Sequence, residues 1–284
     1  MSEIIEQAHA KINLTLDVLH RRTDGYHEVE MVMQSLELAD TITIKKIDQG
    51  IVFKTYSPGI PTGEDNLAWR AARLMVDTFD HDGGLEIFLE KRIPVAAGLA
   101  GGSADAAAVI RGLNRLWKLN ESDEHLCELG ARLGSDIPFC IIEGTALAKG
   151  RGELLTQLAA CPRFWVVLVK PPVGVSTAQV YSRYRQDQVL SRPDTLEIIE
   201  ALREGNRYLI YSNLCNVLES VTFQLVPEVK KIKEELLGAG AVNALMSGSG
   251  PTVFGIAADE NHAIGLAKVF EGLGYTVIVT RTHQ

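Results

Sequence analysis

One glycine-rich stretch constrains this chain more than any other feature. A strand-like run at 85–90 precedes it, and the residues from Ser103 onward are strong helix formers with an apolar stripe. The order is therefore strand, glycine-rich loop, helix. The stretch consists of Pro94, Val95, Ala96, Ala97, Gly98, Leu99, Ala100, Gly101, Gly102, Ser103 and Ala104. Its glycines permit positive φ and leave no Cβ between the backbone and a ligand.

A loop of small residues before a helix suits an anionic ligand, because a helix N-terminus presents unpaired N–H groups. The helix dipole alone contributes only about 0.3–1 kcal/mol to binding an exposed anion, so several N–H groups must converge on it. We expect Ser103 to cap the helix and to reach a phosphate oxygen. The alternative is a tight left-handed turn that merely precedes a buried alanine-rich helix.

Length, charge and cysteine content limit the possible functions. The chain has 284 residues, enough for one large or two medium domains, and 46% of them are hydrophobic. Its net charge of −8 argues against nucleic acid or an anionic membrane as the main partner. The four cysteines form no C-x-x-C pair, and the acidic N-terminus has no signal-type apolar core. We therefore expect reduced thiols and a cytoplasmic location.

A strand near the N-terminus carries a possible pair of site residues. Residues 10–19 alternate between apolar and polar side chains, as in a half-buried strand. Lys11 and Asn13 share the polar face. This face is either exposed to solvent or lines a pocket.

The next polar segment combines an aromatic residue with a histidine. Asp24 and Gly25 form a turn signal, and Tyr26 and His27 follow directly. Such a pair can recognise a nucleobase, because the aromatic ring stacks and the imidazole forms hydrogen bonds. Alternatively, the tyrosine anchors the turn and the histidine faces solvent.

A carboxylate in the middle of the chain has a position that suits catalysis. We predict a helix over 123–133 that ends at Gly134 as its C-cap. Pro138 cannot sit inside that helix, so Asp136 is expected on a short loop before an apolar strand at 137–142. An aspartate there could equally serve only as a turn or cap residue.

The remaining pattern predicts two domains, 1–160 and 161–284, separated at a composition shift. In the first, strands are expected at 29–38, 41–46 and 51–56, a helix at 65–79, and a polar turn at 144–150. The second follows a βαββαβ order, with strands at 164–170, 242–246, 252–256 and 275–280 and helices at 227–237 and 260–273. Further helices are expected at 177–185, 194–204 and 212–220. The 247–251 loop is either a simple hairpin loop or a backbone-rich surface that could pack on the glycine-rich loop from the other domain.

These motifs, taken in order, resemble the GHMP kinases. The stretch from Pro94 resembles the phosphate-binding pattern P-x-x-x-G-L-x-(G/S)-S-x-(A/S), although this chain has Gly-Gly-Ser-Ala-Asp where the family often has Gly-Ser-Ser. The combination with Asp-Gly-Tyr-His resembles the branch that acts on a cytidine diphosphate-linked methylerythritol. The resemblance implies an α+β fold with an N-terminal domain like ribosomal protein S5 domain 2 and a ferredoxin-like C-terminal domain.

The resemblance also implies roles for individual residues. Asp136 would be the catalytic base, Lys11 would sit beside it, and Asn13 would bind the erythritol portion. His27 would recognise the cytosine edge, with Tyr26 on one face of the ring and Tyr181 the best candidate for the other.

The loop would wrap the phosphates of ATP. ATP chemistry implies Mg²⁺, for which the sequence identifies no ligand residues. Asp105, early in the helix, is expected to point away from the phosphates. Monomer and homodimer are both compatible with the sequence. Two alternatives remain: a GHMP kinase for a different alcohol, and a catalytically silent nucleotide-binding paralogue that acts as a regulator.

Overall fold

The computed structural model describes residues 2–284, which form two compact units built from interleaved parts of the chain. The first unit contains the residues up to Ala10, Leu38–Val95 and Ala100–Glu143, and the second contains Lys11–Glu37, Ala96–Leu99 and Gly144–Gln284. The domain boundary at 160/161 stays a prediction. Within the described residues, no helix has the length and apolar character that crossing a membrane requires.

Long strands dominate the sheet of the first unit. Its strands are the first part of β1 (Glu3–Arg21), the last part of β2 (His27–Ile47), β3 (Ile51–Thr55) and β4 (Gly84–Glu90). β4 pairs antiparallel with β2 from Thr41 to Ile47 and parallel with β3. The two strands predicted at 29–38 and 41–46 are one strand, because the backbone stays extended through Asp40 and that side chain is buried.

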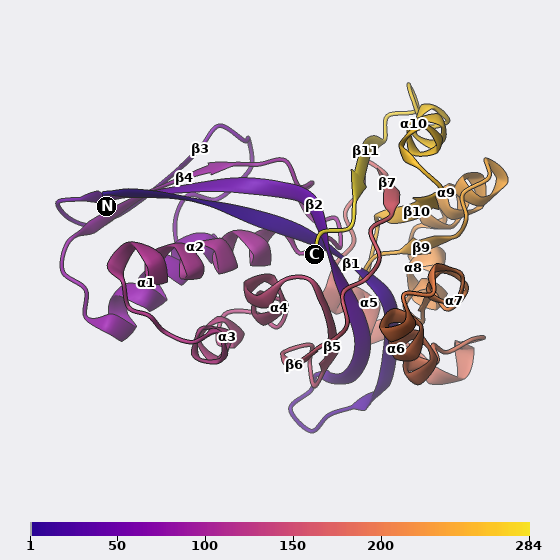
Figure 1. The fold of residues 1–284 in the computed structure, drawn as a ribbon, viewed down its shortest axis with the longest axis horizontal. Coiled ribbons are helices and arrows are strands. Elements are labelled where there is room, and N and C mark those ends of the chain that lie inside the picture. Colours follow the sequence, from indigo (N-terminus) through magenta and orange to yellow (C-terminus); the bar gives the residue numbers. More distant parts are fainter. Residues whose placement is uncertain (1) are drawn as a thin grey trace. The chain divides into compact units, whose positions relative to one another are not determined.

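Four helices complete the first unit and gather on one side of its strands (Figure 1). They are α1 (Leu67–Phe79), α2 (Gly101–Trp117), α3 (Asp123–Ala131) and α4 (Ile137–Ile142). Asn66 caps α1, since its side-chain oxygen accepts from the Ala68 N–H at 2.8 Å. α2 approaches the sheet so closely that a Cβ on Gly112 would lie 2.8 Å from Cδ1 of Ile44.

Two predictions around α3 and α4 were wrong. The apolar run at 137–142 is a helix and not a strand, because a short apolar run has no period that distinguishes the two, and Pro138 is tolerated in the first helical turn. α3 ends at Ala131 with Arg132 as its cap, so Gly134 is not the C-cap.

The second unit contains the sheet expected from the βαββαβ pattern. Its four strands are β7 (Trp165–Lys170), β9 (Ala244–Met246), β10 (Val253–Ala257) and β11 (Thr276–Arg281). Their order is β11-β7-β10-β9, with antiparallel neighbours throughout. The helices α9 (Pro227–Gly238) and α10 (Glu260–Lys268) pack on these strands (Figure 1). The ferredoxin-like prediction is thereby confirmed.

A helical insertion follows β7, as predicted, but one of its elements differs. It contains α5 (Thr177–Arg183), the 3₁₀ helix η1 (Gln186–Gln188), α6 (Thr195–Glu204), α7 (Arg207–Ser212), β8 (Cys215–Asn216) and α8 (Glu219–Leu225). The helix predicted at 212–220 was wrong, because β8 interrupts it to pair in parallel with Thr15 and Leu16 of β1.

The expected polar turn at 144–150 is also a strand. β5 (Thr145–Lys149) pairs with β2 from Met31 to Gln34 and with β6 (Leu154–Gln157). The glycines at both ends suggested a turn, whereas Ala146 and Ala148 between them are fully buried strand positions.

Candidate active site

The polar face of β1 is buried rather than solvated. Asn13 is fully buried and Lys11 is 4% exposed. The Lys11 ammonium donates to Oδ1 of Asn13 at 2.8 Å, and the Asn13 amide lies 3.1 Å from the sulfur of Met31. The alternative in which this face is exposed to solvent is therefore excluded.

Part of the glycine-rich loop lies directly against the 247–251 loop, as the sequence suggested, and both belong to the second unit. The Ser247 hydroxyl donates to the Gly98 carbonyl oxygen at 2.9 Å. Gly98 has a φ of +74°, and a Cβ there would lie 2.3 Å from the Ser247 carbonyl oxygen, so only glycine fits. The Lys11 N–H donates to the Leu99 carbonyl oxygen at 3.2 Å, which joins β1 to the same cluster.

Asn216 holds the 247–251 loop in place, and the sequence analysis missed it. Its amide donates to the carbonyl oxygens of Met246 and Gly248, both at 2.8 Å. A Cβ on Gly248 would lie 3.6 Å from the Lys11 ammonium nitrogen and 3.7 Å from Oδ1 of Asn13. The loop backbone therefore borders the polar pair on β1. Asn216 follows no motif, so only its long-range contacts identify it.

The helix after the glycine-rich loop begins earlier than expected. α2 starts at Gly101, and its N-cap is Ala100 in the left-handed region with φ +57°. Ser103 therefore lies inside the first turn and is not the cap, and no side chain caps the helix. The prediction failed because Gly101 and Gly102 were assigned to the loop. The first N–H groups of α2 remain suited to an anion.

An ionic cluster in the first unit lies beneath the start of α2. The Lys91 ammonium is 2.5 Å from Oδ2 of Asp40 and 2.8 Å from Oδ2 of Asp105. Oδ1 of Asp40 also accepts the N–H groups of Arg92 and Ile93. A Cβ on Gly101 would lie 2.9 Å from the Lys91 ammonium. We call Asp40, Lys91 and Asp105 the lysine cluster.

Asp105 has a perturbed pKa within this cluster. Burial raises its pKa to about 7, against the lowering effect of Lys91 and with a further raising contribution from Asp40. Its side chain is buried against Lys91, in agreement with an orientation away from any ligand of the loop.

Asp136 stands at the N-cap position of α4 in the first unit, half-buried. Its side chain forms no capping hydrogen bond with that helix. The interpretation as a mere cap is therefore not supported by this geometry, and its role as a base stays a prediction.

The predicted base-recognition residues gather in the second unit. The ring centroids of His27 and Tyr181 lie 5.4 Å apart, and those of His27 and Tyr184 lie 6.3 Å apart with the rings nearly perpendicular. Burial, followed by the charge of Arg21, lowers the pKa of His27. The lowered pKa favours the neutral imidazole, which offers one donor and one acceptor. Tyr184 was missed by the sequence analysis.

Tyr26 follows the expected turn and stays accessible. Its N–H donates to Oδ1 of Asp24 at 3.1 Å, and its side chain is 57% exposed. The guanidinium of Arg151 lies over its ring, 5.1 Å from the centroid. The alternative in which Tyr26 anchors the turn to the core is thereby excluded.

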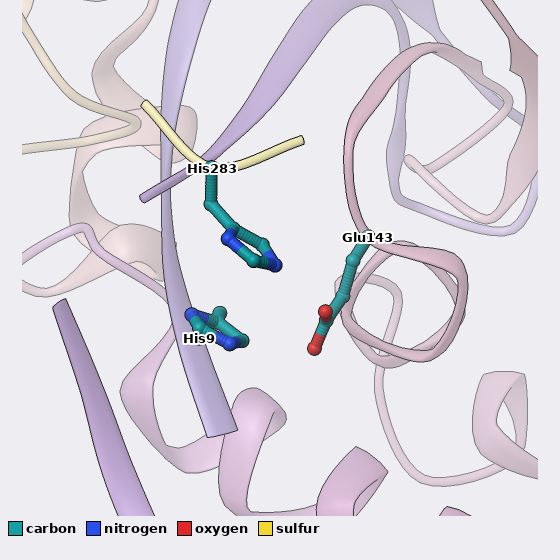
Figure 2. Close-up of side chains that lie close together, drawn as sticks. All are labelled: His9, Glu143 and His283. Atoms are coloured by element: carbon teal, nitrogen blue, oxygen red, sulfur yellow. The ribbon is translucent and has the colours of Figure 1, made fainter. Parts of the chain in front are cut away.

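Among the described residues of the first unit, two side chains that could bind a metal ion lie close together. His9 on β1 and Glu143 at the end of α4 have ligand atoms within 4.8 Å of each other (Figure 2). Arg111 lies 3.1 Å from Oε1 of Glu143 and already supplies a positive charge there. Because this arginine already balances the carboxylate and His9 offers nitrogen, the pair is a poor site for Mg²⁺, which prefers oxygen ligands.

Comparisons with known proteins cover nearly the whole chain. Residues 66–144 match the model of the GHMP kinases N terminal domain, and residues 198–272 match that of the GHMP kinases C terminal. The protein of Alkaliphilus metalliredigens named 4-diphosphocytidyl-2-C-methyl-D-erythritol kinase is 45% identical over 100% of this chain and 96% of its own. The protein of the same name from Bacillus subtilis is 49% identical over 95% and 92%.

A solved structure agrees with these matches. The crystal structure of 4-(cytidine 5'-diphospho)-2C-methyl-D-erythritol kinase superposes with a TM-score of 0.85 at 35% identity. The superposition covers 99% of this chain and 100% of that one.

Proposed function

We propose that this chain, which belongs to the GHMP kinase family, transfers the γ-phosphoryl group of ATP to the 2-hydroxyl of 4-diphosphocytidyl-2-C-methyl-D-erythritol. The products are the 2-phosphate and ADP, and the reaction belongs to non-mevalonate isoprenoid precursor biosynthesis. The main support is a sequence identity of 45–49% to kinases of that name over nearly the whole chain. The packed cluster of Lys11, Asn13 and the two glycine-rich segments supports it.

In the proposed reaction, Asp136 is the base. The substrate oxygen forms a bond to the γ-phosphorus while the bond from that phosphorus to the β-bridging oxygen breaks. The hydroxyl proton passes to the Asp136 carboxylate. Lys11 polarises the hydroxyl and offsets charge on the transferred group. Because the transition state is loose, positioning and electrostatics carry most of the rate enhancement.

The loop from Pro94 to Ala104 would bind the ATP phosphates. The support is local: α2 begins at Gly101 with no side-chain cap, so its first N–H groups have no side-chain acceptor. Close approach of a phosphate is possible because the residues at this end are glycine, alanine and serine.

The second unit would bind the nucleobase and the erythritol portion of the substrate. His27 would form hydrogen bonds with the cytosine edge, while Tyr26 and Tyr181 would contact its faces. A neutral imidazole suits this role because cytosine presents both a donor and acceptors on its pairing edge. Asn13, on the buried face of β1, would bind the erythritol portion.

Mg²⁺ would accompany ATP in this reaction. It prefers oxygen ligands, keeps several waters and usually binds through few protein groups plus substrate phosphates. The Ser103 hydroxyl in the first turn of α2 fits that donor set. When bound, the ion neutralises charge on the β- and γ-phosphates. We also propose a cytoplasmic location, supported by four free cysteines.

The test is an ADP-release assay with ATP, Mg²⁺ and the cytidine substrate, with mevalonate and homoserine in parallel. Release with the cytidine substrate alone supports the proposal. Release with another alcohol would favour a different GHMP kinase. ATP binding without release in any arm would favour a silent paralogue.

A further inference from the structure

Arg192 connects an irregular segment before α6 to the strand β1. Its Nη1 donates to Oδ1 of Asp17 at 2.6 Å and lies 3.4 Å from the Val18 carbonyl oxygen. Its Nη2 donates to the Tyr184 hydroxyl at 3.3 Å. Arginine suits this arrangement because its planar fork can serve several acceptors at once. We call Asp17, Tyr184 and Arg192 the arginine cluster.

The Tyr184 hydroxyl is satisfied as both donor and acceptor. It donates to the Val18 carbonyl oxygen at 3.1 Å while it accepts from Arg192. The side chain is only 8% exposed, and burial raises the pKa of this phenol, so the hydroxyl keeps its proton. Two hydrogen bonds at the end of a buried ring leave the ring little rotational freedom.

The fixed ring of Tyr184 supports His27. The two rings meet nearly edge to face, at 83° and 6.3 Å, and Tyr181 contacts His27 from another direction at 5.4 Å. Edge-to-face contacts are favourable for aromatic rings and prefer particular angles. The orientation of the His27 imidazole therefore depends on where Tyr184 is held.

We propose that Arg192, acting through Tyr184, is a positioning residue that orients His27 toward the pyrimidine edge of the nucleotide substrate. This inference rests on the proposed function, because it takes His27 as the group that recognises the base. Arg192 itself does not contact the substrate in this proposal. It sets the affinity for the cytidine portion and leaves ATP binding unchanged.

The test compares Arg192→Met, Tyr184→Phe and the control Arg203→Met. Arg203 lies on the adjacent helix α6 and pairs with Glu200 at the surface. We expect Arg192→Met to raise the KM for the cytidine substrate about fivefold, with KM for ATP and kcat within twofold of wild type. Tyr184→Phe keeps the ring but loses both hydrogen bonds of its hydroxyl, so its effect on this KM should be at least as large. Arg203→Met should change none of these constants.

A double-mutant cycle identifies the route of the effect. If Arg192 acts through the Tyr184 hydroxyl, the double variant should raise KM no more than Tyr184→Phe alone. Additive effects would overturn the proposed route. Arg192→Lys should recover only part of the affinity, since one ammonium cannot reproduce the fork.

A readout independent of catalysis separates this inference from the proposed function. The ¹⁵N signals of the His27 imidazole report its environment, and Arg192→Met should shift them while Arg203→Met leaves them unchanged. Unchanged signals, or equal rises in KM for both substrates with a lower unfolding temperature, would overturn the inference. If wild-type enzyme fails to phosphorylate the cytidine substrate but the signals shift, the proposed function fails while the coupling stands.

Discussion

The lysine cluster of the first unit and the arginine cluster of the second unit both join a cation to aspartate, but in different surroundings. In the lysine cluster, the side chains of Lys91, Asp40 and Asp105 are 8%, 0% and 6% exposed. In the arginine cluster, the side chain of Arg192 is 34% exposed and that of Asp17 is 10% exposed. The lysine cluster is therefore closed to water, whereas the arginine cluster is partly open to it.

This difference determines what each cluster can do. Burying two carboxylates with one ammonium incurs a large desolvation penalty, so the lysine cluster persists only with accurate geometry. It lies against Gly101, directly after Ala100, whose left-handed conformation is unfavourable for a residue with a Cβ. The arginine cluster needs less exact geometry, because solvent screens part of its charge. The lysine cluster therefore fixes the backbone at the start of α2, whereas the arginine cluster adjusts the position of one side chain, Tyr184.

The largest effect should come from removing the proposed base, Asp136. Asp136→Asn keeps the side-chain shape but removes the base, so kcat should fall about 10²–10⁴-fold. KM for the cytidine substrate should change little in a steady-state assay. Normal turnover by this variant would refute the assignment of Asp136 as the base.

Lys91→Met should be the most destabilising change in the comparison. It leaves Asp40 and Asp105 buried without their cation, which costs about 3–5 kcal/mol in the free energy of unfolding. Urea unfolding measures the loss, and Lys54→Met, which removes an exposed pair with Glu86, should cost far less because solvent screens that pair. The contrast between the clusters fails if Arg192→Met destabilises as much as Lys91→Met.

His27→Ala should raise the KM for the cytidine substrate about 10- to 100-fold, since an unpaired base edge loses its hydrogen bonds. KM for ATP should stay near wild type. The effect should exceed that of Arg192→Met, because Arg192 acts only on the orientation of the ring. A smaller effect at His27 than at Arg192 would reverse that order and contradict the positioning role.

A pH dependence at Asp105 tests the lysine cluster in a second way. Its folded pKa of about 7 exceeds the unfolded value near 3.9, so the folded state retains a proton that the unfolded state releases. This contribution to stability is complete below about pH 4 and is lost as pH rises toward 7, at up to about 1.4 kcal/mol per pH unit.

Asp105→Asn should remove that slope. The difference in unfolding free energy, variant minus wild type, should therefore increase between pH 4.5 and 6.5, because other titrating groups cancel. A constant difference would mean that Asp105 is already ionised across this range.

Local signals in the sequence predicted local structure well. The helix predicted at 65–79 is α1, which begins two residues later, and the βαββαβ order predicted for the second half is present. The failures have a common cause, namely short segments without a resolvable period. The six apolar residues of α4 fit a strand equally well, and the glycines beside β5 resemble those of a turn.

Site residues were predictable where they belong to motifs. Lys11, Asn13 and Gly98 fall in recognisable patterns, and the structure brings them together. Tyr184 and Asn216 do not, because each acts through a partner far along the chain, such as Val18 or Gly248. A sequence pattern gives the spacing between neighbouring residues, but it does not reveal contacts between residues far apart in the chain.

The interleaving of the two units has a consequence for dissecting this enzyme into fragments. The chain passes between the units after Ala10, Glu37, Val95, Leu99 and Glu143. A single cut therefore cannot yield two self-sufficient halves: a fragment ending near residue 160 keeps β1 but loses β8, its parallel partner. Designs that split the chain should instead reunite both fragments before activity is measured. Recovery of activity by the mixed fragments, and not folding of either fragment alone, is then the criterion.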